Sequence, residues 1–242
     1  MTVVAIDAGN TRIKWGLRDG AGWAARGALA TADAGALAAV AARWPHDARI
    51  VLCNVAGEPV REAIMRALPA GADVRLFAAS AECCGVRNGY AQPAQLGADR
   101  WAALVGARGR CADACLVVCA GTATTIDLLA ADGTFRGGVI LPGFDLMRSS
   151  LARNTAQLPL AEGVECTLRP APTNTLDAIV SGCLHAQLGA IERMFAAIAG
   201  EPGARCLLTG GAALRLLNDL NIPVELAENL VLDGLARFAA AG

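Results

Sequence analysis

The sequence predicts an α/β protein built from two similar halves. Each half opens with an apolar strand that ends in a turn carrying Gly and Thr, and each continues into a meander of antiparallel strands and then into helices. The first turn is Asp-Ala-Gly-Asn-Thr at residues 7–11, and the second is Cys-Ala-Gly-Thr-Ala-Thr-Thr at residues 119–125. Because internal repetition indicates a fold more strongly than either turn alone, we expect an N-terminal domain at 1–112 and a C-terminal domain at 113–242.

In the first half, apolar and alternating runs predict strands at residues 2–6, 12–17, 23–29, 49–55 and 73–77. The turn Asp19-Gly20-Ala21-Gly22 joins the second of these strands to the third. Helical periodicity predicts helices at 35–44, 59–68 and 97–109. Between the last strand and the last helix, residues 85–95 form a predicted loop rich in Gly, Asn and Pro. This loop holds Tyr90, the only tyrosine of the chain.

The second half repeats this order of elements. Its predicted strands are residues 115–119, 123–129, 134–140 and 205–208, and Asp132-Gly133 is a hairpin turn. Predicted helices cover 144–157, 174–199, 212–220 and 228–242. Thr173 or Asn174 is suited to cap the second of these helices, because either side chain can accept a hydrogen bond from a backbone N–H of the first turn.

The composition excludes several classes of protein. The chain has 242 residues, 55% of them hydrophobic, with 21 basic against 22 acidic side chains. The resulting net charge of −1 leaves no broad basic field for nucleic acid, and Lys14 is the only lysine, so no lysine tract could bind an anionic membrane. Mean hydropathy is +0.43, yet the longest stretch without charged residues, 178–191, is shorter than the roughly 20 residues of a membrane span. Because no basic flank precedes an apolar N-terminal run, we expect a cytoplasmic protein.

The cysteines and histidines do not form a recognisable metal or disulfide pattern. The nine cysteines are an odd number and include no C-x-x-C. Cys111, Cys115 and Cys119 are spaced by four, and we expect them to be small buried hydrophobic residues. His46 and His185 are the only histidines, and neither stands in a zinc motif, so a catalytic zinc site is not expected.

The two glycine turns are suited to phosphate. Glycine lets the backbone approach an anion closely, and successive N–H groups and hydroxyls can bind it. Asp7 would repel bare phosphate, so its expected role is to hold Mg²⁺ that bridges phosphate oxygens, directly or through water, with Lys14 adding a cation. Taken alone, the first turn is equally typical of an ordinary hairpin. The second turn and a third at Gly210-Gly211 favour a nucleotide, although the chain has neither a G-x-x-x-x-G-K-[ST] nor a G-x-G-x-x-G motif.

Four segments together resemble the type III pantothenate kinases: residues 7–14, Gly-Ala-Asp-Arg-Trp at 97–101, Gly-Thr-Ala-Thr-Thr at 121–125, and Gly210-Gly211. The resemblance covers nearly the whole chain, in order and at similar spacing. It implies the duplicated ribonuclease H-like fold of the actin-like ATPases, with an ATP cleft between two domains. It also implies that Mg–ATP phosphorylates pantothenate to 4′-phosphopantothenate, the first step of coenzyme A biosynthesis, in a homodimer whose substrate pocket lies at the subunit interface.

The resemblance also assigns residues. ATP is expected at the first phosphate loop and at one residue of the second, namely Asp7, Ala8, Gly9, Asn10, Thr11, Arg12, Ile13, Lys14 and Thr122. Pantothenate is expected at Tyr90, Gly97, Ala98, Asp99, Arg100 and, from the partner subunit, Thr175. Asp99 matches the general base, which accepts the proton of the primary hydroxyl as that oxygen attacks the γ-phosphoryl group.

Several alternatives stay open on the residues alone. Asp99-Arg100 is also typical of a capping carboxylate beside a solvated arginine, and Tyr90 of a packing residue. Members of this family that need K⁺ or NH₄⁺ usually have Asp where this chain has Cys119, and a neutral thiol is a poor ligand for a hard cation. We therefore expect weak or no K⁺ activation. The competing functions are a nucleotide-binding regulator, or a kinase or phosphohydrolase of the same superfamily that acts on another substrate.

Overall fold

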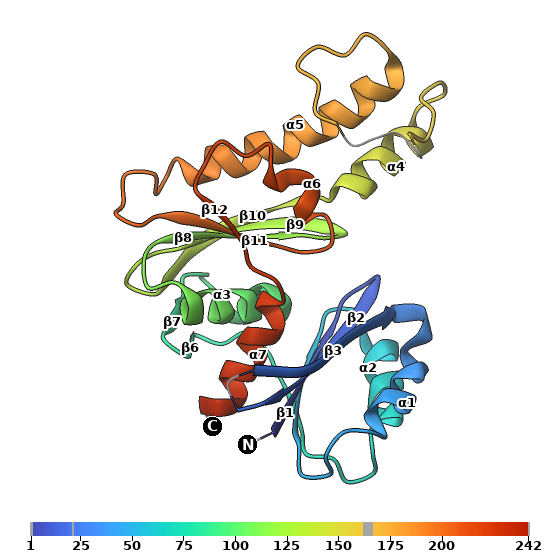
Figure 1. The fold of residues 1–242 in the computed structure, drawn as a ribbon, viewed down its shortest axis with the longest axis vertical. Coiled ribbons are helices and arrows are strands. Elements are labelled where there is room, and N and C mark those ends of the chain that lie inside the picture. The colour runs from blue at the N-terminus through green and yellow to red at the C-terminus, as the bar shows by residue number, and fades with distance from the viewer. Residues whose placement is uncertain (1, 21, 162–166, 242) are drawn as a thin grey trace. The chain divides into compact units, whose positions relative to one another are not determined.

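The computed structural model describes residues 2–20, 22–161 and 167–241. The chain divides into two compact units (Figure 1). The first unit holds residues 1–112, 133–135 and 229–242, and the second unit holds residues 113–132 and 136–228. Of the features expected from the sequence, Ala21 in the turn at 19–22 and the cysteine at position 166 lie outside the described residues.

The first unit contains a five-stranded sheet in the order β3-β2-β1-β4-β5. β1 and β2 are antiparallel, as are β2 and β3, whereas β1 is parallel to β4 and β4 to β5. The elements of this unit up to residue 112 are β1 Thr2–Ala8, β2 Arg12–Asp19, β3 Gly22–Ala30, the 3₁₀-helix Thr31–Ala36, α1 Leu37–Ala41, β4 Arg49–Asn54, α2 Glu58–Ala67, β5 Val74–Leu76, β6 Glu82–Cys83, β7 Val86–Asn88, the 3₁₀-helix Pro93–Gln95 and α3 Ala98–Arg110.

The second unit repeats the sheet order of the first. Its strands lie in the order β12-β11-β8-β9-β10, with β8 antiparallel to β9 and parallel to β11. The elements are β8 Cys115–Ala120, β9 Ala123–Leu129, β10 Thr134–Pro142, α4 Phe144–Asn154, α5 Thr175–Phe195, β11 Arg205–Thr209, α6 Ala213–Leu217 and β12 Val224–Leu226. The α/β fold and its internal duplication, both predicted from the sequence, are confirmed.

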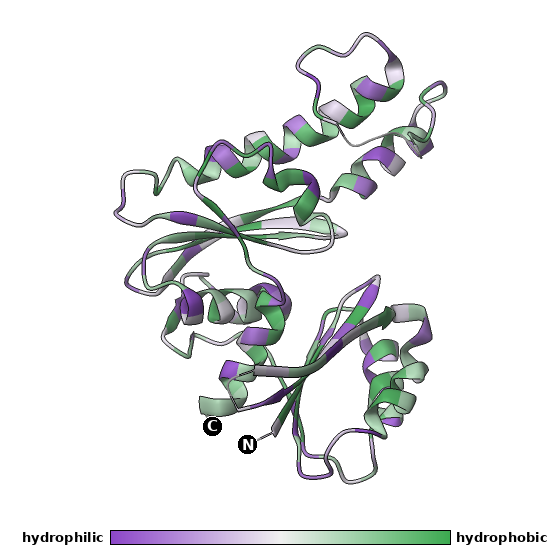
Figure 2. Cartoon of the chain, viewed as in Figure 1, coloured by the Kyte–Doolittle hydropathy of each residue, from purple (hydrophilic) through white to green (hydrophobic). Residues whose placement is uncertain are grey.

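Each unit has its own hydrophobic core. In the first unit, Val4, Ile6 and Ile64 are buried among residues of β1, β4, α1 and α2. In the second unit, Leu116, Val118 and Leu184 belong to a cluster that joins β8, β9 and β11 to α4, α5 and α6. The covering helices carry both hydrophobic and hydrophilic residues (Figure 2), as amphipathic helices on a sheet do. Within the described residues, no helix has the length and hydrophobicity required to span a membrane.

Reciprocal contacts between tryptophan and glycine tie β2 to β3. Trp15 of β2 lies over Gly27 of β3, where a Cβ atom would stand 2.6 Å from the indole ring. Trp23 of β3 lies over Gly16 of β2, where a Cβ atom would stand 2.5 Å from the ring. Because only glycine leaves this space, the two rings cover the backbone of the opposite strand.

Of the three cysteines spaced by four, two are buried as expected. Cys111 follows α3 and Cys115 begins β8, and both are buried, whereas Cys119 near the end of β8 is half-buried. The cysteines in the described part of the chain are free thiols.

Some predicted elements are wrong in length or were missed. The helix expected at 35–44 is a 3₁₀-helix followed by the single turn of α1, and the helix expected at 212–220 is the short α6. The strands β6, β7 and β12 were missed, because segments of two or three residues show no periodicity. The N-cap of α5 is Asn174, whose Oδ1 accepts from the backbone N–H of Asp177 (3.0 Å).

The last helix, α7 (Leu230–Ala241), corrects the expected domain division. The sequence analysis assigned it to the C-terminal domain, but it belongs to the first unit and packs on α3. The two backbones approach closely because glycines face each other. A Cβ atom at Gly234 would stand 2.7 Å from the carbonyl carbon of Ala102 and 3.0 Å from the nitrogen of Gly106. No short-range pattern reveals such a contact between distant segments.

We expect Gly234→Ala to destabilise the protein by about 2–4 kcal/mol, because the added methyl group must push two packed helices apart. Gly189→Ala is the matched control, since Gly189 also lies in a helix but its Cβ atom would meet nothing within 4 Å. The control should be neutral or stabilising by about 0.5–1 kcal/mol. Urea unfolding measures both variants, and equal stability of the two would contradict the proposed close packing.

Candidate nucleotide and substrate site

The first phosphate loop begins at Asp7, near the end of the central strand β1. Asp7 lies opposite Lys14 on β2 and beside Cys53 on the parallel strand β4. The Asp7 side chain is 9% exposed. Pairing on both sides therefore holds this carboxylate in a fixed and largely dry position, with one cation on the neighbouring strand.

The turn that follows is fixed by hydrogen bonds that its main-chain carbonyl groups accept. The N–H of Gly9 donates to the Arg12 carbonyl (3.1 Å), and Thr31 donates from its N–H to the Thr11 carbonyl (3.1 Å). Thr31 also donates from Oγ1 to the Gly9 carbonyl (2.7 Å). The outer residues Asn10, Thr11 and Arg12 are exposed. The loop is thus a fixed turn with an open outer surface, which suits an anion such as phosphate.

Burial raises the pKa of Asp7 from 3.8 to about 6; the Lys14 charge acts in the opposite direction, and the Asp99 carboxylate raises the pKa further. Burial, together with the charges of Asp7 and Asp99, also raises the pKa of the Cys53 thiol well above its usual value. The first unit therefore brings Asp7, Lys14 and Asp99 into electrostatic contact, although Asp99 is remote from the other two in the sequence. A nearby cation stabilises the charged form of a buried carboxylate whose pKa is raised, so the position of Asp7 is suited to a cation.

The second phosphate loop repeats the hydrogen bonds of the first. The Ala8 carbonyl accepts from the N–H of Val55 (3.0 Å), and the Ala120 carbonyl accepts from the N–H of Ala212 (3.0 Å). The turn residue Thr122 accepts at its carbonyl from the N–H of Gly143 (2.9 Å), as Thr11 accepts from Thr31. In this correspondence Cys119 occupies in β8 the place that Asp7 occupies in β1.

Two further glycines let backbone segments close on this second loop. A Cβ atom at Gly143 would clash with the carbonyl oxygens of Gly121 and Thr122, and one at Gly210 would clash with the backbone of Ala120. Gly210 also has a φ of +107°, which disfavours other residues. The glycine turn after β11 therefore packs against the second loop, as a joint nucleotide site requires.

The hydroxyls of the second loop are not equally available. Thr122 is exposed in the turn, whereas Thr124 and Thr125 are 2% and 8% exposed in β9. The expectation that this whole segment offers hydroxyls is therefore wrong for the last two threonines. The two side chains point to opposite faces of β9, and both faces are covered, so both hydroxyls are buried.

Asp99 and Arg100 lie in the first turn of α3, which begins directly after Gly97. The Asp99 Oδ1 accepts from the N–H of Arg100 (2.9 Å), and a Cβ atom at Gly97 would stand 2.8 Å from that same oxygen. The glycine at this position lets the carboxylate fold back over the start of the helix. A negative charge is favourable there, since the helix N-terminus is the positive end of its dipole.

Arg100 is not the solvated arginine of the alternative interpretation. Its side chain is 5% exposed, and its Nη1 donates to the Tyr90 hydroxyl (2.9 Å). The guanidinium lies 5.7 Å from the centre of the Tyr90 ring and 6.0 Å from that of Phe135. The two rings are 5.3 Å apart. Tyr90, Arg100 and Phe135 thus form one cluster, which we call the aromatic–arginine shelf.

Two residues of this region are not indicated by any motif in the sequence. Phe135 is the second residue of β10 and is fully buried, and Asn88 at the end of β7 is its ladder partner. Asn88 lay in a predicted loop, and its position two residues before Tyr90 was the only local signal. Phe135 had no signal, because its neighbours in space come from a different part of the chain.

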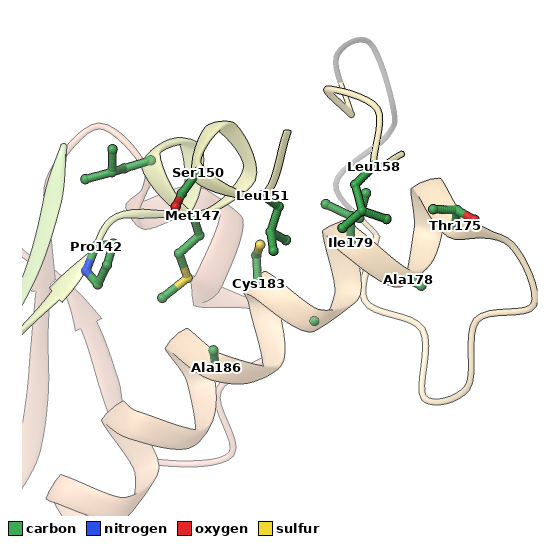
Figure 3. Close-up of a pocket in the computed structure, with 12 residues that line it drawn as sticks. Pro142, Met147, Ser150, Leu151, Leu158, Thr175, Ala178, Ile179, Cys183 and Ala186 are labelled. Carbon is green, nitrogen blue, oxygen red and sulfur yellow. The ribbon is translucent and has the colours of Figure 1, made fainter. Parts of the chain in front are cut away.

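Thr175 lies in the second unit, at the exposed start of α5. It lines one end of a groove of about 740 Å³ between α4 and α5. Figure 3 shows Met147 and Leu151 of α4 directed toward the face of α5 that carries Ile179 and Cys183. The groove is mainly apolar, and it is a different environment from that of Tyr90 and Arg100, which belong to the first unit.

The residues present fit a magnesium ion that arrives with the nucleotide. Among the described residues, no three His, Cys, Asp or Glu side chains form a group able to hold a metal. A buried carboxylate whose pKa is raised, as at Asp7, is a suitable single ligand. Mg²⁺ commonly takes one or two carboxylates and completes its shell with phosphate oxygens and water.

Comparison with known proteins gives a consistent result. A family model described as type III pantothenate kinase matches residues 3–197. A type III pantothenate kinase of Aromatoleum aromaticum is 59% identical over 238 residues, covering 98% of this chain and 97% of the relative. Another of Azoarcus sp. is 52% identical over 242 residues, covering 99% and 91%.

Solved structures support the fold. MreB5 of Spiroplasma citri bound to ADP aligns with a TM-score of 0.55 over 99% of this chain and 96% of its own, at 12% identity. This likeness, together with the repeated sheet order, confirms the duplicated ribonuclease H-like fold of the actin-like ATPases. On the family model and the two relatives, the chain belongs to the type III pantothenate kinase family.

Proposed function

We propose that this chain transfers the γ-phosphoryl group of ATP to the primary hydroxyl of pantothenate, with Asp99 as general base and Asp7 organising Mg–ATP. Family membership supports the kinase activity, which is the first step of coenzyme A biosynthesis. The observation that carries the assignment of roles is the electrostatic contact of Asp7 and Asp99 in one unit. This contact supports the proposal that a metal-binding carboxylate and a base act at one reaction centre.

In this proposal, each of the two phosphate loops binds phosphate oxygens of the nucleotide. The exposed residues 10–12 and the exposed Thr122 would contact the phosphates, and the turn at Gly210-Gly211 would face the adenosine. Ala8 and Ile13 are fully buried, so only their main-chain groups could contribute to the ATP site expected there. Mg²⁺ bound to ATP would neutralise phosphate charge and orient the γ-phosphoryl group. Asp7 would ligate that ion directly or through water, and Lys14 would bind a phosphate oxygen.

Asp99 is suited to accept the hydroxyl proton late in a loose transition state, when the attacking oxygen becomes acidic. Its neighbour Arg100 would bind the pantothenate carboxylate through its planar guanidinium group. Tyr90 and the backbone of Gly97 and Ala98 would line the same pocket. The shelf holds Arg100 in one orientation before substrate arrives, which reduces the entropy that binding must overcome.

We also propose a cytoplasmic homodimer in which Thr175 reaches the pantothenate of the partner subunit. The apolar groove beside Thr175 supports this, since exposed apolar surface is typical of subunit contacts. Leu146, Leu151 and Leu176 around it are 43%, 37% and 39% exposed. A second copy packed on this face would bury them and place Thr175 at the interface.

The rival functions are less well supported. A regulator without turnover needs neither a base nor a metal-binding carboxylate, yet Asp7, Asp99 and Thr122 are all present. A kinase or phosphohydrolase with another substrate would not require the buried arginine and tyrosine of the shelf. Both rivals make different predictions in the assay below.

A coupled assay of ADP release tests the function and the base together. With Mg–ATP, we expect release that depends on pantothenate and is not supported by sugars or acetate. Asp99→Asn should keep the fold and lower kcat by about 10²–10⁴, the usual contribution of a general base. ADP release without pantothenate would indicate a hydrolase. Near wild-type turnover of the variant would show that Asp99 positions the substrate and is not the general base.

Asp7→Asn should raise the stability of the protein at neutral pH and weaken its binding of Mg–ATP. Because burial raises the pKa of Asp7 to about 6, the folded protein retains this proton better than the unfolded chain, and stability falls as pH rises from about 4 to 6. The variant, neutral at every pH, should be more stable than wild type at neutral pH by about 1–3 kcal/mol and equal to it near pH 4. Its KM for Mg–ATP should rise about tenfold or more.

Urea unfolding at the two pH values and Mg²⁺ titrations of activity measure these effects. Lower stability of the variant at neutral pH, or an unchanged Mg²⁺ dependence, would contradict the role of Asp7.

Cys119 is expected to remove the response to monovalent cations. It stands where β1 has Asp7, so the second loop lacks the corresponding carboxylate. Wild type should show little difference between K⁺ and tetramethylammonium, whereas Cys119→Asp should gain activation by K⁺, which prefers oxygen ligands. A steep K⁺ requirement of the wild-type enzyme in the same titration would show that other oxygen ligands replace the missing carboxylate.

A further inference from the structure

Asn88 binds three main-chain groups of the segment that carries Tyr90. Its Nδ2 donates to the carbonyls of Ser80 (3.1 Å) and Pro93 (3.3 Å), and its Oδ1 accepts from the N–H of Tyr90 (3.1 Å). These contacts connect Ser80 at the start of the segment, Pro93 near its end and Tyr90 between them. A single amide thereby closes the whole loop before α3.

The same residue is joined to the support beneath Tyr90. Asn88 is the ladder partner of Phe135, which is fully buried and lies 5.3 Å from the Tyr90 ring. The backbone of Tyr90 is thus held by Asn88, and its ring rests on the residue paired with Asn88. The Tyr90 hydroxyl in turn accepts from Arg100.

We propose that Asn88 is a positioning residue for pantothenate, which acts by holding Tyr90 in the orientation that contacts Arg100 and the substrate. This inference rests on the proposed function of the shelf. Asn88 itself makes no contact with ATP or the reacting atoms in this proposal. Its removal should therefore weaken pantothenate binding and leave the nucleotide and the chemical step nearly unchanged.

The chemistry of the amide explains why asparagine stands there. Two carbonyl oxygens need donors and one N–H needs an acceptor, and an Asn side chain provides both from one planar group. Aspartate keeps the acceptor for Tyr90 but has no donor for Ser80 and Pro93. Alanine provides neither.

Steady-state kinetics on the full-length chain tests the proposal. Asn88→Ala should raise KM for pantothenate about tenfold or more, the effect of losing one or two net hydrogen bonds, with KM for ATP and kcat within about threefold of wild type. Gln95→Ala is the control from the same segment, since the side chain of Gln95 is exposed and donates to Gln92. The control should leave all three constants unchanged.

A double-mutant cycle distinguishes positioning from a general structural role. If Asn88 acts through Tyr90, Asn88→Ala should add little to the KM effect of Tyr90→Ala. Independent effects that multiply, or equal changes in both KM values, would overturn the proposal. Asn88→Asp, which preserves size and should fold readily, is expected to raise KM for pantothenate about three- to tenfold; a wild-type KM in this variant would also overturn it.

These outcomes are separable from those of the proposed function. If wild type shows no pantothenate-dependent ADP release, the function itself is wrong. If wild type is active and the Asn88 variants bind pantothenate normally, only the positioning role is wrong.

Discussion

Pairing of a central strand on both sides is the constraint on which the rest of this structure depends. β1 is paired with β2 and β4, and β8 with β9 and β11, so main-chain hydrogen bonds fix the end of each strand from both sides. Each strand ends in a glycine turn whose carbonyls are bound within the unit. The residues at these two ends, Asp7 and Cys119, are therefore placed by backbone hydrogen bonds rather than by their own side chains. This is a suitable way to hold a ligand-binding loop rigid.

Placing a carboxylate at such a position costs stability. Asp7 is nearly dry, and the positive charge of Lys14 acts on it, while Asp99 adds a second negative charge to the region. In the absence of a nucleotide, part of this cost is relieved by protonation. In the proposed function, a magnesium ion carried by ATP would relieve more of this cost, because a nearby cation favours the charged form of a carboxylate.

The aromatic–arginine shelf reduces the conformational entropy that the Arg100 side chain has left to lose. An arginine side chain loses about 2 kcal/mol of conformational entropy when it is ordered, and Arg100 is ordered already by Tyr90 and Phe135. The support is extended by the ladder pair of Asn88 and Phe135. In the proposed function, affinity for a small carboxylate would therefore depend also on Asn88 and Phe135, which do not touch it in that proposal.

The sequence by itself determined the α/β class, the duplication, the two glycine turns and the resemblance carried by residues 97–101, because strand alternation, glycine turns and motif order are local properties of the chain. The tertiary structure alone decided four matters: that α7 belongs to the first unit, that Asp7 and Asp99 interact, that Arg100 is buried, and that Phe135 supports Tyr90. It also decided that Thr124 and Thr125 are buried, because both faces of β9 are covered. Each of these results from packing between segments distant in sequence, where a glycine such as Gly234 or a ring such as Phe135 matters only through the residue it meets. Local patterns contain no record of that residue, and so only the folded chain shows it.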